Sequence, residues 1–174
     1  MMNSKKTGII ITGAESTGSV FASKAIFKSF GFDGWNGYGF YKPNHQFKFL
    51  HRSQPYGKNN YSNYQELSSF FQNFECKYIL CTRDITCSNL SKQRRFNRTD
   101  SDLKHNHNTC KQIIFEIISS GEPYFIWNYE TMIYLGKIYF DLLYDFLEIK
   151  NSDRYYPCIL NKNIQSFNND FDSK

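Results

Sequence analysis

The sequence predicts a three-layer α/β fold in which a parallel sheet is flanked by helices. Short runs rich in β-branched and aromatic residues alternate with longer amphipathic segments, as in successive βαβ units. The clearest unit comes first: Ile9, Ile10 and Ile11 form a buried strand, a loop of small residues follows from Gly13, and a helical pattern begins at Val20. Because βαβ crossovers are right-handed, we expect helices on both faces of the sheet.

The length of 174 residues suits one domain with a substantial core. We place this domain at residues 1–150, followed by a partly irregular C-terminal extension at residues 151–174. No run approaches the ~20 apolar residues of a membrane span, and the first apolar run is too short for a signal peptide. We therefore expect a soluble cytoplasmic protein with no membrane partner. The oligomeric state stays open.

Charge and cysteine usage narrow the class of ligand. The formal charge of +5 fits an anionic ligand but does not require nucleic acid, which we do not expect as a partner. The five cysteines form no CxxC pair, so free and mostly buried thiols are expected. His105 and His107 stand in a polar stretch without a third ligand at suitable spacing, and we expect no metal.

The first half of the chain continues with a helix, a crossover, a strand and a second helix. The helix over residues 20–31 is followed by a glycine- and aromatic-rich stretch that predicts a loop or crossover. Residues 47–51 have the pattern of a strand, and a nearby proline and glycine leave His51 and Arg52 at its end. Apolar residues at helical spacing predict an amphipathic helix over residues 64–74.

The second half repeats the alternation of strands and helices. The expected elements are a strand at 77–82, a helix from 85 that becomes strongly basic, a loop at 97–108, a helix at 110–118, a strand at 124–127 and a helix at 131–147 broken at Gly136. Parallel sheets of this kind bind ligands at the carboxyl ends of their strands. We therefore expect one ligand-binding edge, formed by the Gly13 loop, the His51–Arg52 turn, Arg83 and the Asn128–Glu130 corner.

The loop Gly13-Ala14-Glu15-Ser16-Thr17-Gly18-Ser19 resembles the Walker loop of P-loop proteins, because its two glycines stand five positions apart. A strand, a small-residue loop and a helix N-terminus aim backbone N–H groups at one point, which suits a phosphate or sulfate. The Walker lysine is absent, since Ser19 takes its place and Val20 replaces the magnesium-binding hydroxyl. An ordinary ATP- or GTP-hydrolysing site is therefore disfavoured. The alternative is a purely structural role, in which the glycines only allow a tight turn.

A second signal lies far along the chain. Arg83 follows the strand at 77–82, and Ser91 comes eight residues later on the next helix. A guanidinium fork and a hydroxyl suit a phosphate better than the alternative of a surface ion pair. The segment YILCTRDITCSNLSKQRRF resembles the sulfotransferases that use 3′-phosphoadenosine 5′-phosphosulfate (PAPS), in which a strand-ending arginine and a serine eight positions on bind the donor's 3′-phosphate. Ile85 replaces the proline usual in that family.

The first loop also resembles this family. Its donor loop carries a basic residue before Ser-Gly-Thr-Thr, and Ser16-Thr17-Gly18-Ser19-Val20 aligns with it by the glycine, with Ser16 in the basic position. The resemblance implies a P-loop NTPase-like, sulfotransferase-like fold and PAPS, or its product 3′-phosphoadenosine 5′-phosphate (PAP), as the bound nucleotide. The donor-binding residues that it implies are Gly13, Glu15, Ser16, Thr17, Gly18, Ser19, Val20, Arg83 and Ser91.

Because the loop lacks its cation, another cation has to stabilise the leaving oxygen during transfer. Arg52 is the first candidate, followed by Lys24 and Arg154. His51 is the candidate general base, and the alternative is a partly buried histidine with a structural hydrogen bond. His51 and Arg52 are thus the expected catalytic residues. The basic run at residues 92–98 predicts a lid over the nucleotide's phosphate, a surface for a charged glycan or nucleic acid, or simply a solvated helix end.

The leading hypothesis is a PAPS-dependent sulfotransferase that acts on a hydroxyl of a small molecule or glycan. Two alternatives stay open: a divergent P-loop kinase, and a non-catalytic nucleotide- or anion-binding module with the same fold. Since Glu15 and Ser16 stand where a cation is usual, the loop supports binding better than it supports catalysis.

Overall fold

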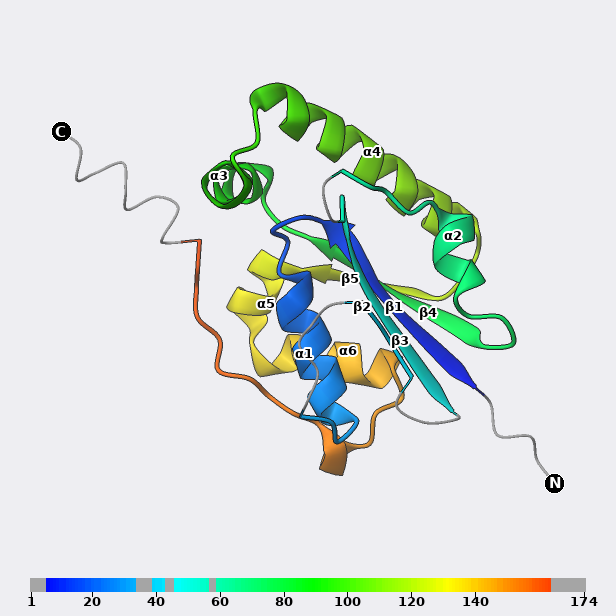
Figure 1. Ribbon diagram of the computed structural model, residues 1–174. Helices are drawn as coiled ribbons and strands as arrows, with labels where there is room; N and C mark the ends of the chain where they lie inside the picture. The colour runs from blue at the N-terminus through cyan, green and yellow to red at the C-terminus, as the bar shows by residue number, and fades with distance from the viewer. Residues whose placement is uncertain (1–5, 34–38, 43–45, 57–58, 164–174) are drawn as a thin grey trace.

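The computed structural model describes residues 6–33, 39–42, 46–56 and 59–163, and its centre is a five-stranded sheet (Figure 1). The strands lie in the order β2-β3-β1-β4-β5. Their bounds are β1 (Thr7–Ala14), β2 (Gly39–Tyr41), β3 (Phe47–Gln54), β4 (Glu75–Thr82) and β5 (Tyr124–Asn128). Strands β3, β1, β4 and β5 are mutually parallel, and β2 adds an antiparallel edge.

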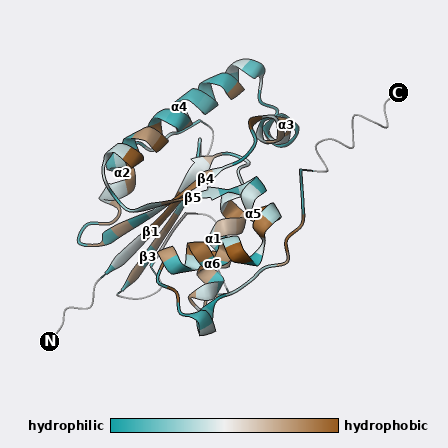
Figure 2. Ribbon diagram, turned by 180° about the vertical axis from the view of Figure 1, so that it is seen from behind, coloured by the Kyte–Doolittle hydropathy of each residue, from teal (hydrophilic) through white to brown (hydrophobic). Residues whose placement is uncertain are grey.

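Helices cover both faces of this sheet. Their bounds are α1 (Ser19–Ser29), α2 (Tyr64–Ser69), α3 (Ile85–Phe96), α4 (Asp100–Ser119), α5 (Tyr129–Leu135) and α6 (Lys137–Phe146), followed by a 3-10 turn, η1 (Asn151–Asp153). Helices α1, α5 and α6 lie on one face, α2 and α4 lie on the other, and α3 lies beyond the carboxyl ends of the strands (Figures 1 and 2). The predicted α/β fold, with parallel strands flanked by helices, is confirmed. None of the helices among the described residues is long and apolar enough to cross a membrane.

Alternation along β1 produces the two halves of the core. Ile9 and Ile11 face α1, α5 and α6, where they join a cluster that includes Phe140. Ile10 faces the opposite way and packs in a second cluster with Leu67 of α2 and Ile117 of α4. In Figure 2, α4 is mostly hydrophilic, whereas the strands and α6 carry much of the hydrophobic colour. The isoleucine run of the sequence is therefore a central strand that is covered on both faces.

Several predicted boundaries are wrong. The helix expected over residues 64–74 is α2, which ends at Ser69 because the chain continues in turns, with Asn73 at a φ of +65°. The stretch 97–108 is largely helical, because α4 begins at Asp100, where Thr99 and Asp102 form a capping box. The predicted start at residue 110 missed a buried stripe that runs on from Leu103 at helical spacing. Strand β3 is longer than predicted, since its pairing with β1 continues to Gln54. The expected helix break at Gly136 does separate α5 from α6.

The C-terminal segment packs back on the domain. Tyr155 N–H donates to Ser29 Oγ at 2.9 Å, and Arg154 pairs with Asp141 of α6 at 3.1 Å. From η1 the segment passes α1 and α5 and runs toward α3 (Figure 1). Residues 154–163 therefore lie against the body that the sequence assigned to residues 1–150. Most of the glycine- and aromatic-rich stretch after residue 33, and the tail beyond residue 163, lie outside the described residues.

Candidate functional site

Two glycines shape the loop between β1 and α1. A Cβ atom on Gly13 would lie 2.2 Å from the carbonyl oxygen of Cys81, so β1 approaches β4 too closely there for a side chain. Gly18 has a φ of +83°, and a Cβ on it would lie 2.8 Å from the ring of Tyr129. Packing alone accounts for both glycines. Whether the loop suits an anion therefore depends on its polar groups.

Most polar groups at the tip of the loop make no hydrogen bond to the described residues. Among the described residues, no hydrogen bond takes up the backbone N–H of Ser16, Thr17 or Gly18. Ser16 has a φ of +64°, and its Oγ is buried with no partner in the described part of the chain. The Thr17 hydroxyl instead donates to the carbonyl oxygen of Ala14 at 2.7 Å. Backbone donors beside a helix N-terminus, without internal acceptors, are a suitable environment for an anion.

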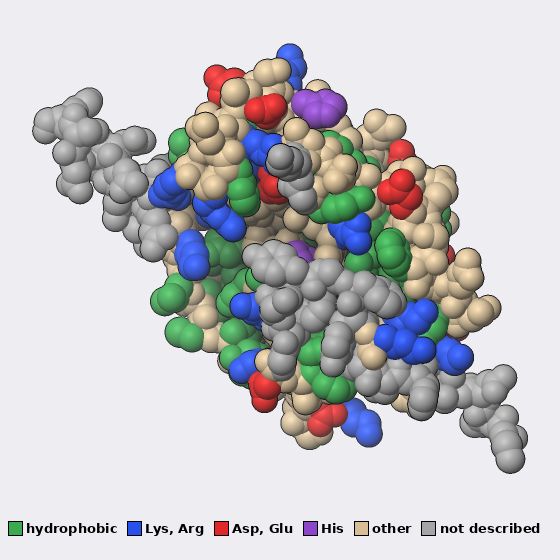
Figure 3. Space-filling model, viewed as in Figure 1, with side chains coloured by type: hydrophobic (Ala, Val, Ile, Leu, Met, Phe, Trp, Pro, Cys, Tyr) green, Lys and Arg blue, Asp and Glu red, His purple; other side chains and the backbone are tan. Residues whose placement is uncertain are grey.

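A cavity of about 720 Å³ opens beside this loop; we call it the first cavity. The N-terminal half of α1, the end of β4, the outer edge of α3, α5 and the C-terminal segment form its walls. Its lining residues are Ser16, Gly18, Val20, Phe21, Lys24, Arg83, Ser91, Arg94, Arg95, Tyr129, Met132, Cys158, Leu160 and Lys162. Five of these are cations and none is acidic. Figure 3 shows Lys and Arg side chains gathered around the hollow beside α3.

Arg83 joins the parts of this cavity. Its Nη1 donates to the carbonyl oxygen of Ser16 at 3.0 Å, and its Nε donates to Asn163 Oδ1 at 2.9 Å. The guanidinium lies 4.7 Å from the centre of the Tyr129 ring, and Nε lies 4.0 Å from a carboxylate oxygen of Glu130. The arginine at the end of β4 thus holds the loop, α5 and the C-terminal segment together. Glu130 also accepts a hydrogen bond from Asn163 Nδ2 at 2.8 Å.

Helix α3 brings a hydroxyl and two more guanidinium groups to the same cavity. Asp84 caps the helix by accepting from the N–H of Cys87 at 2.9 Å, and this hydrogen bond lowers the pKa of the Asp84 carboxyl. Ser91 lies on the buried side, and Arg94 and Arg95 follow in the next turn. Residues three and four apart lie along one side of a helix, so these three side chains line one edge of α3.

A second cavity, of about 460 Å³, lies on the other side of the loop, against β3. His51 and Arg52 both line it, and both lie within β3 rather than at its end. His51 is buried, with Nε2 placed 2.8 Å from Ser19 Oγ. The Arg52 guanidinium stacks over Tyr56 at 4.1 Å and lies outside the first cavity.

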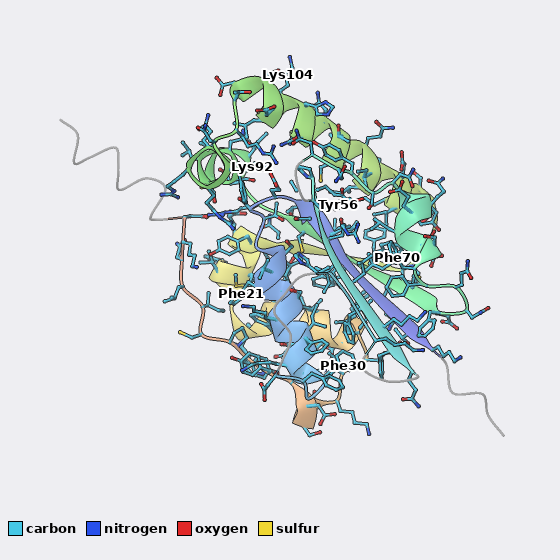
Figure 4. All side chains as sticks on the ribbon, in the orientation of Figure 1. Phe21, Phe30, Tyr56, Phe70, Lys92 and Lys104 are labelled. Carbon is cyan, nitrogen blue, oxygen red and sulfur yellow. The ribbon has the colours of Figure 1, made fainter. Side chains whose placement is uncertain are left out.

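Glu15 is held away from the first cavity. Its carboxylate accepts from Nη2 of Arg98 at 3.3 and 3.4 Å, and it lines only the second cavity. Lys92 is fully buried nearby, on the side of α3 that faces α4 (Figure 4), and burial lowers the pKa of its ammonium group. The basic run at residues 92–98 therefore serves two purposes. Lys92 and Arg98 lie inside, around Glu15, while Arg94 and Arg95 line the first cavity.

The cavity-lining residues that the sequence analysis did not predict lie on the C-terminal segment. Tyr129 Oη donates to the carbonyl oxygen of Leu160 at 3.2 Å and accepts from the N–H of Lys162 at 3.3 Å. These contacts place Cys158, Leu160 and Lys162 in the cavity wall. No motif marks them, because an irregular segment has no periodicity to identify its inner face.

Three other candidates from the sequence lie away from both cavities. Arg154, one of the candidates for the substitute cation, is bound to Asp141 and Asp145 and does not line either cavity. His105 and His107 are exposed on α4 rather than in a loop. The described residues contain no group of three or more His, Cys, Asp or Glu side chains placed to hold a metal.

Comparison of the chain with protein-family models, with curated proteins and with solved structures finds no match. What the chain does must therefore be inferred from the chemistry of the two cavities beside the loop.

Proposed function

We propose that this chain is a sulfotransferase-like protein with a P-loop-like donor site, which transfers a sulfuryl group from PAPS to a hydroxyl of a small molecule or glycan. One observation carries the proposal. Ser16 and Gly18 of the loop line the same cavity as Arg83 and Ser91, although the chain separates the loop from these two residues by more than sixty positions. These are the positions at which the sequence resembles the PAPS-dependent sulfotransferases.

The hydrogen-bond donors that line the first cavity fit a nucleotide with two anionic ends. Arg83 and Ser91 would hold the 3′-phosphate, because a guanidinium donates in a planar fork and a hydroxyl adds a further donor. The free N–H groups of the loop and the unpartnered Ser16 Oγ would hold the 5′-phosphosulfate. A volume of about 720 Å³ lies within the range of roughly 300–1,000 Å³ typical of small-molecule sites.

The second cavity is the proposed place for the acceptor. PAPS supplies an activated sulfuryl group. The acceptor oxygen forms a new S–O bond as the S–O bond to the 5′-phosphate breaks, and the electron pair of the broken bond stays on the nucleotide. His51, which lines this cavity, takes the proton of the acceptor hydroxyl, because an imidazole is a suitable base near neutral pH. Catalysis then rests on positioning and on cations beside the developing charge.

A non-catalytic nucleotide-binding module is the second candidate, and one observation favours it. Arg83 already donates to Asn163, while the loop position that is basic in sulfotransferases is Ser16. Such a module would bind PAPS without turning it over. A divergent kinase has less support, because Ser19 and Val20 replace the lysine and hydroxyl that ATP and magnesium need.

Isothermal titration calorimetry with PAP tests the donor site. We expect the native chain to bind PAP and to bind ATP with magnesium more weakly. Arg83→Ala and Ser91→Ala should each weaken PAP binding, by roughly tenfold for the loss of a charge-assisted hydrogen bond at Arg83. Lys104→Ala is the matched control, because Lys104 is exposed on α4 (Figure 4) and lines neither cavity.

Absence of PAP binding at millimolar concentration would refute the proposal. Binding of PAPS without formation of PAP, against a broad panel of phenols, alcohols and sugars, would favour the module instead.

A further inference from the structure

The two cavities share a border. Three residues line both of them: Ser16, Val20 and Arg95. A group that passes from a donor in the first cavity to an acceptor in the second has to cross this border. Of the three residues, only Arg95 carries a charge.

The position and exposure of Arg95 allow its side chain to reach a ligand at the border of the two cavities. It lies in the last turn of α3, four residues after Ser91, so both side chains lie on the same side of the helix. The residue is exposed, and within the described part of the chain its guanidinium makes no hydrogen bond or ion pair. The centre of the Phe96 ring lies 4.9 Å from the guanidinium carbon. An arginine in this state can turn toward a ligand without breaking an internal bond.

The other arginines near the loop have partners. Arg83 donates to Ser16 and Asn163, Arg98 to Glu15, and Arg52 stacks on Tyr56 and donates to Ser62 at 3.5 Å. The remaining cations of the first cavity do not line the second. These are Lys24, Arg94 and Lys162.

We propose that Arg95 is a catalytic residue that supplies, at the border of the two cavities, the positive charge that Ser16 cannot supply. This inference rests on the proposed function and assigns to Arg95 the role for which Arg52 was the first candidate.

The positive charge of Arg95 is needed in the transfer of the sulfuryl group. As the sulfuryl sulfur moves from the 5′-phosphate oxygen of PAPS to the acceptor oxygen, the bridging oxygen keeps the electron pair and becomes more negative. The acceptor oxygen loses its proton to His51. A guanidinium beside the bridging oxygen and the sulfuryl oxygens lowers the energy of this charge distribution. Arginine also offers paired donors that match the oxygens of such a group.

Paired binding measurements with PAPS and PAP test the proposal, because only PAPS has the sulfuryl group. The experiment compares the dissociation constants of both nucleotides for the native chain, Arg95→Ala, Arg95→Lys and Arg94→Ala. We expect Arg95→Ala to weaken PAPS binding by roughly tenfold and PAP binding far less, since one charge-assisted contact to the sulfuryl group is lost. Arg95→Lys, which keeps the charge, should restore most of the difference. Arg94→Ala, one position away and confined to the first cavity, should weaken both nucleotides by the same factor.

Equal weakening of PAPS and PAP by Arg95→Ala, or no weakening of either, would overturn the role of Arg95 while leaving the donor site intact. Failure of the native chain to bind either nucleotide would refute the proposed function itself. Thermal unfolding of each variant shows whether it is folded. Arg95 is exposed and makes no hydrogen bond to the described residues, so its variants should unfold at the native temperature.

Discussion

The carboxylate of Glu15 lies 3.3 Å from a guanidinium nitrogen of Arg98, and both side chains are almost fully buried. The two residues are 83 positions apart, on the first loop and on the connection between α3 and α4. The pair explains how an acidic residue can stand in a loop that is otherwise suited to an anion. Because Arg98 neutralises Glu15 and turns it away from the first cavity, the carboxylate does not oppose the five cations there.

Removal of Arg98 should therefore destabilise the chain and impair the loop. We expect Arg98→Ala to lower the free energy of unfolding by about 3 kcal/mol, because the buried Glu15 carboxylate loses its partner. The double variant Arg98→Ala/Glu15→Gln should recover most of this loss and also recover PAP binding. Urea unfolding measures the first effect and calorimetry the second. A double variant as unstable as Arg98→Ala would show that the carboxylate is not the source of the loss.

Cys158 offers a direct readout of occupancy in the first cavity. It is the exposed cysteine among the five and it lines this cavity, while Cys76, Cys81, Cys87 and Cys110 are buried. We expect iodoacetamide to modify Cys158 alone in the native protein, and PAP to slow the reaction. Mass spectrometry of the intact chain, with and without PAP, measures this. The same rate with saturating PAP would place the nucleotide elsewhere.

Stability should fall in alkaline solution because of the buried thiols. Burial raises the pKa of Cys110 from 9.0 to about 12, so at high pH the unfolded chain loses this proton before the folded chain does. The stabilisation is complete below pH 9 and is lost as the pH rises from there toward 12. Between pH 8 and pH 10, the destabilisation caused by Cys110→Ala should therefore shrink by about 1.4 kcal/mol. A constant difference between native and variant in urea unfolding would contradict this.

Local patterns in the sequence predicted most of the fold. Runs such as Ile9 to Ile11 are informative because a strand that is covered on both faces is apolar throughout. The one misplaced helix start shows the limit of this reasoning. Polar residues around His105 concealed a buried stripe of which only Leu103, Asn106 and every third or fourth residue thereafter face inward. Such a wide spacing among exposed polar side chains is difficult to distinguish from a loop.

Some residues of the candidate site were predictable from the sequence and others were not. Arg83 and Ser91 were predictable, because a strand end and the helix that follows it fix their spacing along the chain. Their shared cavity with Ser16 follows from the parallel sheet, which brings the carboxyl ends of β1 and β4 to one edge. The choice among the cations did not follow from the sequence. Arg52, Lys24 and Arg154 are all cations, and only their places in the folded chain distinguish them.

The sequence by itself determined the order of strands and helices, the small-residue loop and the basic character of the end of α3, because each of these is a property of neighbouring residues. Only the tertiary structure decided that Arg98 neutralises Glu15, that the C-terminal segment closes the first cavity, and that Arg95 lies where the two cavities meet. The physical reason is that these relationships depend on packing between segments far apart in the chain. The spacing of residues along the chain does not predict which of several similar side chains forms an ion pair and which remains exposed to a ligand.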